Sequence, residues 1–164
     1  MFTGSITALV TPMTTSGALD ELSMQSLIAT QLEQGIHGLV IHGTTGEACT
    51  LTEQERRQAL TLALSKVSGK VPVIAGTGSN STAETIRESK AACALGADAC
   101  LVVTPYYNRP TQAGLFEHFH QVADAVQCPI LLYNVPTRTG CDLLPETVEK
   151  LSRHPNIIGI KEAT

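Results

Sequence analysis

Residues 156–164 read NIIGIKEAT, an apolar and β-branched run that closes on a charged amine. Asn156 to Ile160 has the composition of a buried strand, and Lys161 follows at its carboxyl end. An amine in that position either reaches water or meets a substrate. The rest of the chain has to show which of the two applies.

Five similar runs precede this one along the chain. They are SITALVTP (5–12), GLVIHG (38–43), VPVIAGTG (71–78), ACLVVTP (99–105) and PILLYNVP (129–136). Each is short, rich in apolar residues and nearly continuous rather than alternating. That pattern is typical of strands buried on both faces of a parallel sheet.

The segments between these runs carry helix signals. Thr52 with Glu55 and Ser81 with Glu84 have the spacing of a capping box. An apolar stripe predicts a first helix around 19–32, and it is formed by Leu19, Leu22, Met24, Leu27, Ile28 and Leu32. Glycines 35, 69 and 96 stand where helices should end. We therefore predict six strands alternating with five helices.

Such alternation predicts an α/β fold with right-handed crossovers. An open, doubly wound sheet would carry a nucleotide-binding fingerprint, but GTGSNS at 76–81 lacks its third glycine. A TIM (β/α)8 barrel places its chemistry at the carboxyl ends of the strands, where the unusual residues of this chain gather. A closed barrel has eight strands and about 250 residues. We thus expect residues 1–164 to be the N-terminal portion of a barrel, without its last two β/α units and C-terminal helical region.

Composition excludes several classes of function. The formal net charge is −4, and the 11 Lys and Arg residues are scattered, so we expect no nucleic-acid partner. No run of about 18 apolar residues predicts a membrane helix, and the first residues do not resemble a signal peptide. We predict a cytoplasmic protein.

The cysteines and histidines predict no metal site. Five cysteines, at 49, 93, 100, 128 and 141, include no C-x-x-C pair, which argues against both a disulfide framework and a zinc site. We interpret them as small, mostly buried residues. His118 and His120 lie two apart in a helical stretch and should point to different faces.

Polar residues cluster after four of the predicted strands. In HGTTGEA (42–48), Thr44 and Thr45 can offer hydroxyls and backbone N–H groups to a carboxylate, although the segment alone indicates only a turn. In TPYYNRP (104–110), Tyr106 and Tyr107 are adjacent, which fits packing or a subunit contact as well as catalysis.

Two further strand ends complete this set. In LYNVPTRTG (132–140), Tyr133 can act as an acid or base and Arg138 can bind a carboxylate, and each could also be structural. Lys161 on an apolar strand would lose some of its ammonium form by desolvation, leaving free amine to attack a carbonyl. A solvated lysine is the ordinary alternative. The coincidence of all these groups at one end of successive strands favours an active site.

Four of these motifs, GTTGE, TPYYNRP, YNVPTRTGCDL and IIGIKEAT, occur in the order and spacing of a known family. The sequence resembles the dihydrodipicolinate synthase branch of the pyruvate-dependent class I aldolases over the whole chain, from FTGSITALVTPM onward. The resemblance implies a β/α barrel that condenses pyruvate with L-aspartate semialdehyde in lysine and diaminopimelate synthesis. It implies a homodimer or homotetramer and no metal or organic cofactor.

The resemblance also implies roles for individual residues. Lys161 would hold pyruvate as a Schiff base, and Tyr133 would be the acid and base. Thr44 would link Tyr133 to Tyr107, which would come from a neighbouring subunit. Thr45 would bind the carboxylate of pyruvate, and Arg138 that of the second substrate.

Two alternatives remain beside this reading. N-acetylneuraminate lyase and the keto-deoxy sugar acid aldolases share the lysine, the tyrosine and a glycine-threonine turn. The arginine of PTRTG favours a small carboxylated aldehyde over a sugar. A non-catalytic, truncated fragment is the other alternative.

The resemblance extends in part to the family's lysine feedback site. Asn80, Glu84 and Tyr106 match positions that line it. The sequence departs from lysine-inhibited relatives at Ala48, Cys49, Glu53 and Arg56. A guanidinium at position 56 would repel the ammonium group of lysine, so weak or absent inhibition is predicted.

Overall fold

A computed structural model describes residues 2–164, in which the chain divides into two compact units. The first unit consists of the described part of Met1–Gly76 together with Leu95–Asp98. Asp98 belongs with it because it exchanges two hydrogen bonds with Val73. The second unit consists of Thr77–Ala94 and Ala99–Thr164.

The first unit is a parallel sheet with two main helices. Its elements are β1 (Ile6–Ala8), α1 (Glu21–Glu33), β2 (Gly38–Ile41), the short 3-10 turns η1 (Thr44–Gly46) and η2 (Ala48–Thr50), α2 (Glu53–Val67) and β3 (Val73–Gly76). Val40 of β2 aligns with Ala8 on one side and with Ile74 on the other. All four residues of β2 are buried, as the continuous apolar run predicts.

Helix α1 begins at an aspartate cap. The Asp20 carboxylate accepts hydrogen bonds from the backbone N–H and the hydroxyl of Ser23, at 3.0 and 2.7 Å. Met24 and Ile28, one turn apart, are fully buried and form the centre of the apolar stripe. Leu22 was predicted to belong to this stripe and is 80% exposed. Its position is about 160° around the helix from Met24, so the stripe is narrower than the sequence indicated.

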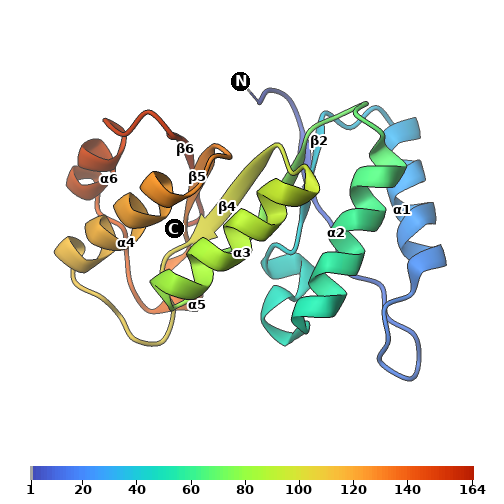
Figure 1. Cartoon of the computed structure of the whole chain (residues 1–164), viewed down its shortest axis with the longest axis horizontal. Helices are drawn as coiled ribbons and strands as arrows, with labels where there is room; N and C mark the ends of the chain where they lie inside the picture. The colour runs from blue at the N-terminus through green and yellow to red at the C-terminus, as the bar shows by residue number, and fades with distance from the viewer. Residues whose placement is uncertain (1) are drawn as a thin grey trace. The chain divides into compact units, whose positions relative to one another are not determined.

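Helix α2 lies beside α1 in Figure 1 and begins with the predicted capping box. The Thr52 hydroxyl accepts from the backbone N–H of Glu55, while the Glu55 carboxylate accepts from the backbone N–H of Thr52 at 2.8 Å. The helix ends at Ser68, in the left-handed region, and Gly69 follows with a φ of 73°.

The second unit contains three parallel strands and four helices. Its elements are α3 (Thr82–Leu95), β4 (Ala99–Val103), α4 (Gln112–Ala125), β5 (Ile130–Asn134), α5 (Pro136–Thr139), α6 (Pro145–Leu151) and β6 (Ile157–Glu162). Tyr133 of β5 aligns with Val103 of β4 and with Lys161 of β6. The six predicted strands are thereby confirmed.

Helix α4 packs its apolar face into this unit. Leu115, Phe119 and Val122 are fully buried along one face. His118 is also buried and its Nδ1 lies 2.9 Å from the Thr82 hydroxyl, whereas His120 is only partly buried and contacts Asp124. The prediction that these two histidines point to different faces is confirmed.

The helix count differs from the prediction. The described chain contains six α-helices and two 3-10 turns, where five helices were expected. The additional α-helix is α5, a single turn inside PTRTG. Pro136 at its first position presets the helical φ, and Gly140 ends it with a φ of 75°.

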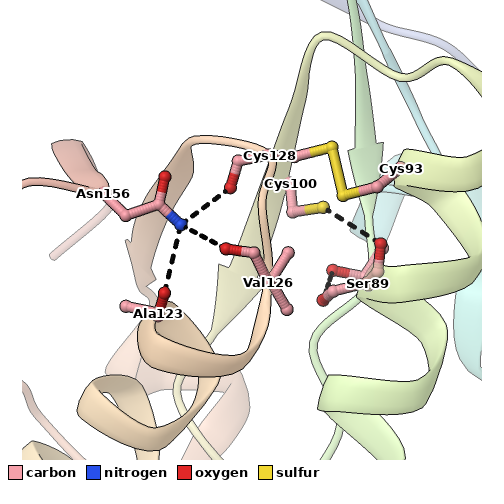
Figure 2. The surroundings of a disulfide bond; sticks show 8 residues. Ser89, Cys93, Cys100, Ala123, Val126, Cys128 and Asn156 are labelled. Atoms are coloured by element: carbon pink, nitrogen blue, oxygen red, sulfur yellow. Dashed lines mark hydrogen bonds between the residues drawn. A yellow bond between two sulfur atoms is a disulfide. The ribbon is translucent and has the colours of Figure 1, made fainter.

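The prediction against a disulfide was wrong for one pair of cysteines. Cys93 and Cys128 form the disulfide that Figure 2 shows, and their Cα atoms lie 5.8 Å apart. The pairing arises because the last turn of α3 and the segment before β5 meet in space, although 35 residues separate them. Cys100 is buried, Cys141 is partly buried and Cys49 is exposed.

Within residues 2–164, none of the helices combines the length and the apolar composition needed to cross a membrane.

Candidate active site

Lys161 and Tyr133 form the centre of the candidate site. They are register partners on the adjacent strands β6 and β5, so their side chains stand on the same face of the sheet. The Lys161 Nζ lies 4.3 Å from the centroid of the Tyr133 ring, within the range of a cation–π contact. The structure thus brings together the two residues to which the sequence assigned amine and acid–base chemistry.

A bulge sets this register. Ile130 aligns with Ile157, but the next residue, Leu131, aligns with Gly159, so Ile158 is the extra residue of β6. Without that extra residue Ile160 would stand opposite Tyr133. The bulge therefore places the Lys161 amine beside the Tyr133 phenol. Nothing in the sequence pattern indicated this bulge.

The environments of the two residues differ. Tyr133 is 6% exposed, as expected for an aromatic residue at the end of a buried strand. Lys161 is exposed in this chain, in contrast to the shielded amine that the sequence predicted. Ile158 and Ile160 on the same strand are also exposed, at 46% and 36%. The apolar composition of β6 therefore did not translate into burial of its amine within this chain.

Asn134 links the strand that carries Tyr133 to the strand that carries Lys161. Its side-chain amide donates to Asp142 at 2.7 Å and to the Glu162 carboxylate at 3.2 Å, using both of its hydrogens. Its side-chain oxygen accepts the backbone N–H of Leu143 at 3.0 Å. Asn134 is 1% exposed, so this network fixes the end of β6 beside β5.

Asn134, Asp142 and Glu162 were not predicted from the sequence to belong to the site. The available signal was Glu162 itself, a second ionisable residue directly after the candidate lysine. Asn134 directly follows the candidate tyrosine in the same way.

Arg138 lies in the single turn of α5, with its side chain exposed. The turn is held by Thr139, which is 4% exposed and whose hydroxyl accepts from Thr104 at 3.2 Å. The Arg138 guanidinium therefore extends from a turn that is fixed by hydrogen bonds, and it remains accessible to an anion from solution.

The tyrosine pair lies in the loop after β4, against the same turn. The backbone N–H of Tyr107 donates to the Thr139 carbonyl at 3.3 Å, and the Arg109 Nε donates to the Gly140 carbonyl at 2.8 Å. Tyr107 has a φ of 74° and is 89% exposed, whereas Tyr106 is partly buried. A bulky residue in the left-handed region is costly, so the loop is constrained to present the Tyr107 side chain outward.

Thr44 and Thr45 belong to the first unit, where they form η1. The turn is anchored by the Thr11 hydroxyl, which donates to the Gly46 carbonyl at 2.7 Å. Glu47 follows in the left-handed region with a φ of 55°. Both threonine side chains are exposed, so their hydroxyls are accessible to a ligand.

His42 precedes this turn and is 5% exposed. Burial, with a further contribution from the charge of Arg56, lowers its pKa from 6.5 to about 4. Its Nε2 is buried without a hydrogen-bond partner among the described residues. A neutral imidazole therefore precedes the turn, and its only signal in the sequence is the position of His42 before Gly43.

The residues matched to a lysine site lie in different settings. The Asn80 carbonyl accepts from the Asn108 amide at 3.0 Å, and the Glu84 carboxylate contacts Arg87 at 2.5 Å. Tyr106 belongs to the same unit. Among the positions at which the sequence differs from lysine-inhibited relatives, Cys49 lies in η2, and Glu53 and Arg56 lie in the first turn of α2.

Comparisons with known proteins agree with one another. A model of the dihydrodipicolinate synthetase family matches residues 1–164. The chain is 54% identical over 164 residues to a 4-hydroxy-tetrahydrodipicolinate synthase of Pseudomonas aeruginosa, and 56% identical over 160 residues to one of Stenotrophomonas maltophilia. It covers 56% and 54% of the length of these two relatives.

Solved structures give the same result. The chain matches a chloride-inhibited dihydrodipicolinate synthase from Acinetobacter baumannii, complexed with pyruvate, with a TM-score of 0.99 and 50% identity. The match covers 100% of this chain and 56% of that one. The barrel class predicted from the sequence is confirmed, and the chain spans about half the length of the relatives that it matches.

Proposed function

Because the chain belongs to the dihydrodipicolinate synthetase family, we propose that the protein condenses pyruvate with L-aspartate semialdehyde to 4-hydroxy-tetrahydrodipicolinate. The observation that carries this proposal is the register pairing of Lys161 with Tyr133, which places an amine 4.3 Å from the centre of a phenol ring. The pyruvate complex of the Acinetobacter relative supports the choice of the keto acid.

The first step is imine formation on Lys161. The free amine attacks the keto carbon of pyruvate, and the resulting carbinolamine loses its hydroxyl as water when the Tyr133 phenol supplies a proton. Loss of a methyl proton from the imine gives an enamine. The enamine carbon attacks the aldehyde carbon of the second substrate, which forms the new carbon–carbon bond.

The other site residues bind the substrates or transfer protons. Thr45 binds the carboxylate of pyruvate, and Thr44 passes protons between Tyr133 and Tyr107. The high exposure of Tyr107 supports its supply to a neighbouring subunit of a homodimer or homotetramer. Arg138 binds the carboxylate of the semialdehyde, because an exposed guanidinium on a rigid turn offers a bidentate contact. No metal or organic cofactor takes part, and the setting is the cytoplasm.

Lysine regulates this protein weakly or not at all in our proposal. Arg56 contributes positive charge at a position matched to the lysine site, where it opposes the ammonium group of lysine. A titration with lysine should leave the rate nearly unchanged at submillimolar concentrations. Strong inhibition in that range would refute this part of the proposal.

The substrate assignment is tested by supplying pyruvate with different aldehydes to the purified protein. We expect product from L-aspartate semialdehyde and none from N-acetylmannosamine or from small sugar aldehydes. Replacement of Arg138 by Leu should raise the KM for the semialdehyde at least tenfold and leave the KM for pyruvate within about threefold, since a charge-assisted contact contributes about 1.5–3 kcal/mol. If the protein condensed pyruvate only with sugar aldehydes, its function would instead be that of a sugar acid lyase.

A further inference from the structure

Three cysteine sulfurs lie together outside the candidate active site. Cys93 is in the last turn of α3, Cys100 is in β4 and Cys128 stands two residues before β5. Their Sγ atoms all lie within 4.8 Å of one another, and Figure 2 shows Cys100 beside the disulfide that joins the other two. We call these residues the three-cysteine cluster.

Cys100 and Cys128 are held by contacts other than the disulfide, and Cys93 is part of helix α3. Cys100 aligns with Ile130 in the sheet, and its backbone N–H donates to the Pro129 carbonyl at 2.9 Å. The Cys128 carbonyl accepts from the side-chain amide of Asn156 at 3.1 Å. The same amide reaches the Val126 carbonyl at 2.7 Å, so the segment before β5 is fixed by Asn156. The three sulfurs should therefore stay close when the disulfide is opened.

The polar partners of the Cys100 thiol are backbone and hydroxyl groups. Cys100 is fully buried, and its thiol donates weakly to the Ser89 carbonyl at 3.8 Å. Burial raises the pKa of this thiol. Among the described residues, no histidine or carboxylate completes the three-cysteine cluster as a fourth donor. A ligand at this place must accept three sulfurs and leave little net charge behind.

We propose that the reduced three-cysteine cluster is a binding site for a soft, three-coordinate ion, and that trivalent arsenic is the ion that fits it best. Structural zinc takes four ligands, and with three thiolates it would also leave a negative charge beside buried Cys100. Arsenic(III) forms a neutral compound with three thiolates and needs no fourth donor. Soft thiolate ligands suit such an ion. The Cys93–Cys128 disulfide is the closed form of the site.

Opening and loading the site are two balanced steps. A trialkylphosphine attacks the disulfide and takes an oxygen atom from water, which gives a phosphine oxide and the two thiols of Cys93 and Cys128. Arsenous acid then exchanges its three hydroxyls for three cysteine sulfurs, breaking three S–H bonds and releasing three waters. The second step involves no change of oxidation state.

The test measures arsenite binding to the phosphine-reduced protein by native mass spectrometry and near-ultraviolet absorption. We expect one arsenic per chain, added with loss of three waters, and an absorption band that the reduced protein lacks before arsenite is added. Loss of only two waters, or no binding after reduction, would overturn the proposal. So would zinc binding more tightly than arsenite.

A serine substitution tests the third sulfur directly. Cys100→Ser should weaken arsenite binding at least tenfold, while Cys49→Ala, a cysteine outside the cluster, should leave binding unchanged. Re-formation of the Cys93–Cys128 disulfide on oxidation verifies that the Cys100→Ser protein is folded. If it does not re-form, the mass of the loaded, unsubstituted protein decides, because a loss of only two waters would show that one of the three sulfurs is not bound and would contradict the proposal. Unaltered binding by folded Cys100→Ser would also contradict it.

Discussion

Lys161 and Tyr133 stand opposite each other on β6 and β5 because one extra residue, Ile158, shifts the register of the last strand. The amine of Lys161 lies 4.3 Å from the centre of the Tyr133 ring. The ring is buried and the amine is exposed, so the pair joins a fixed phenol to an accessible nucleophile.

Removal of the phenol oxygen should slow imine formation without unfolding the protein. Tyr133→Phe keeps the ring that contacts Lys161 and removes the proton donor. We expect the rate of pyruvate adduct formation to fall about 10²- to 10⁴-fold, the range for loss of a general acid. This rate is measured by stopping the reaction at successive times and determining the intact mass of the protein. Tyr106→Phe is the matched control, and an equal loss in both variants would argue against a specific role for Tyr133.

A negative charge at position 134 should destabilise the second unit. Asn134→Asp would place a third carboxylate against Asp142 and Glu162 in a buried position and remove both amide donors. The free energy of unfolding in urea should fall by about 3–5 kcal/mol, the cost of an uncompensated buried charge. Asn108→Asp, in an exposed loop, should change it by less than about 1 kcal/mol. Equal effects would show that the Asn134 network contributes little.

Acid should destabilise the fold through two buried histidines. Burial is the main cause that lowers the pKa values of His42 and His118 from 6.5 to about 4. As the pH falls below 6.5, the unfolded chain binds protons that the folded chain does not, so stability present above pH 6.5 is lost on the way to pH 4. The loss approaches about 1.4 kcal/mol per pH unit for each histidine.

Substitution of one histidine isolates its share of this dependence. His118→Gln cannot be protonated, so the unfolding free energy of this variant should change less between pH 6.5 and 5 than that of the parent, by about 1.5 kcal/mol. Urea titrations at several pH values give the comparison. A parallel pH profile in the two proteins would contradict the assignment.

Two glycines in the first unit should respond differently to substitution. A Cβ at Gly76 would overlap the carbonyl oxygen of His42, a backbone atom that cannot move aside without disturbing β2 and β3. Gly76→Ala should cost about 1–3 kcal/mol or more. A Cβ at Gly43 meets only Val40 Cγ1, at 3.4 Å, and its φ of −69° suits alanine. Thermal unfolding compares the two variants, and equal stability would refute the close approach at Gly76.

Local signals in the sequence identified most of the fold. The β-branched run before Lys161 indicated a strand, and Thr52 with Glu55 indicated a helix start, because neighbouring residues alone determine these features. The bulge at Ile158 could not be found in this way. It depends on how β6 aligns with β5, and a run of isoleucines is compatible with either register.

Contacts between distant segments account for the other differences. Cys93 and Cys128 carry no spacing signal, and their disulfide exists because the end of α3 reaches the segment before β5. Likewise, Asn134 is an ordinary residue in the sequence, and its role depends on Asp142 and Glu162 meeting at the ends of two strands. The exposure of Lys161 could not be predicted from its apolar neighbours, because burial depends on what packs over the strand.

Borohydride reduction in the presence of pyruvate tests the central claim most directly, because only an amine that forms an imine is trapped. The purified protein, treated with pyruvate and borohydride and then digested, should carry a stable adduct on Lys161 and on no other lysine. Lys161→Arg should carry none. Lack of an adduct in the parent protein, or its appearance on Lys150 or another lysine with Lys161 unmodified, would contradict the account.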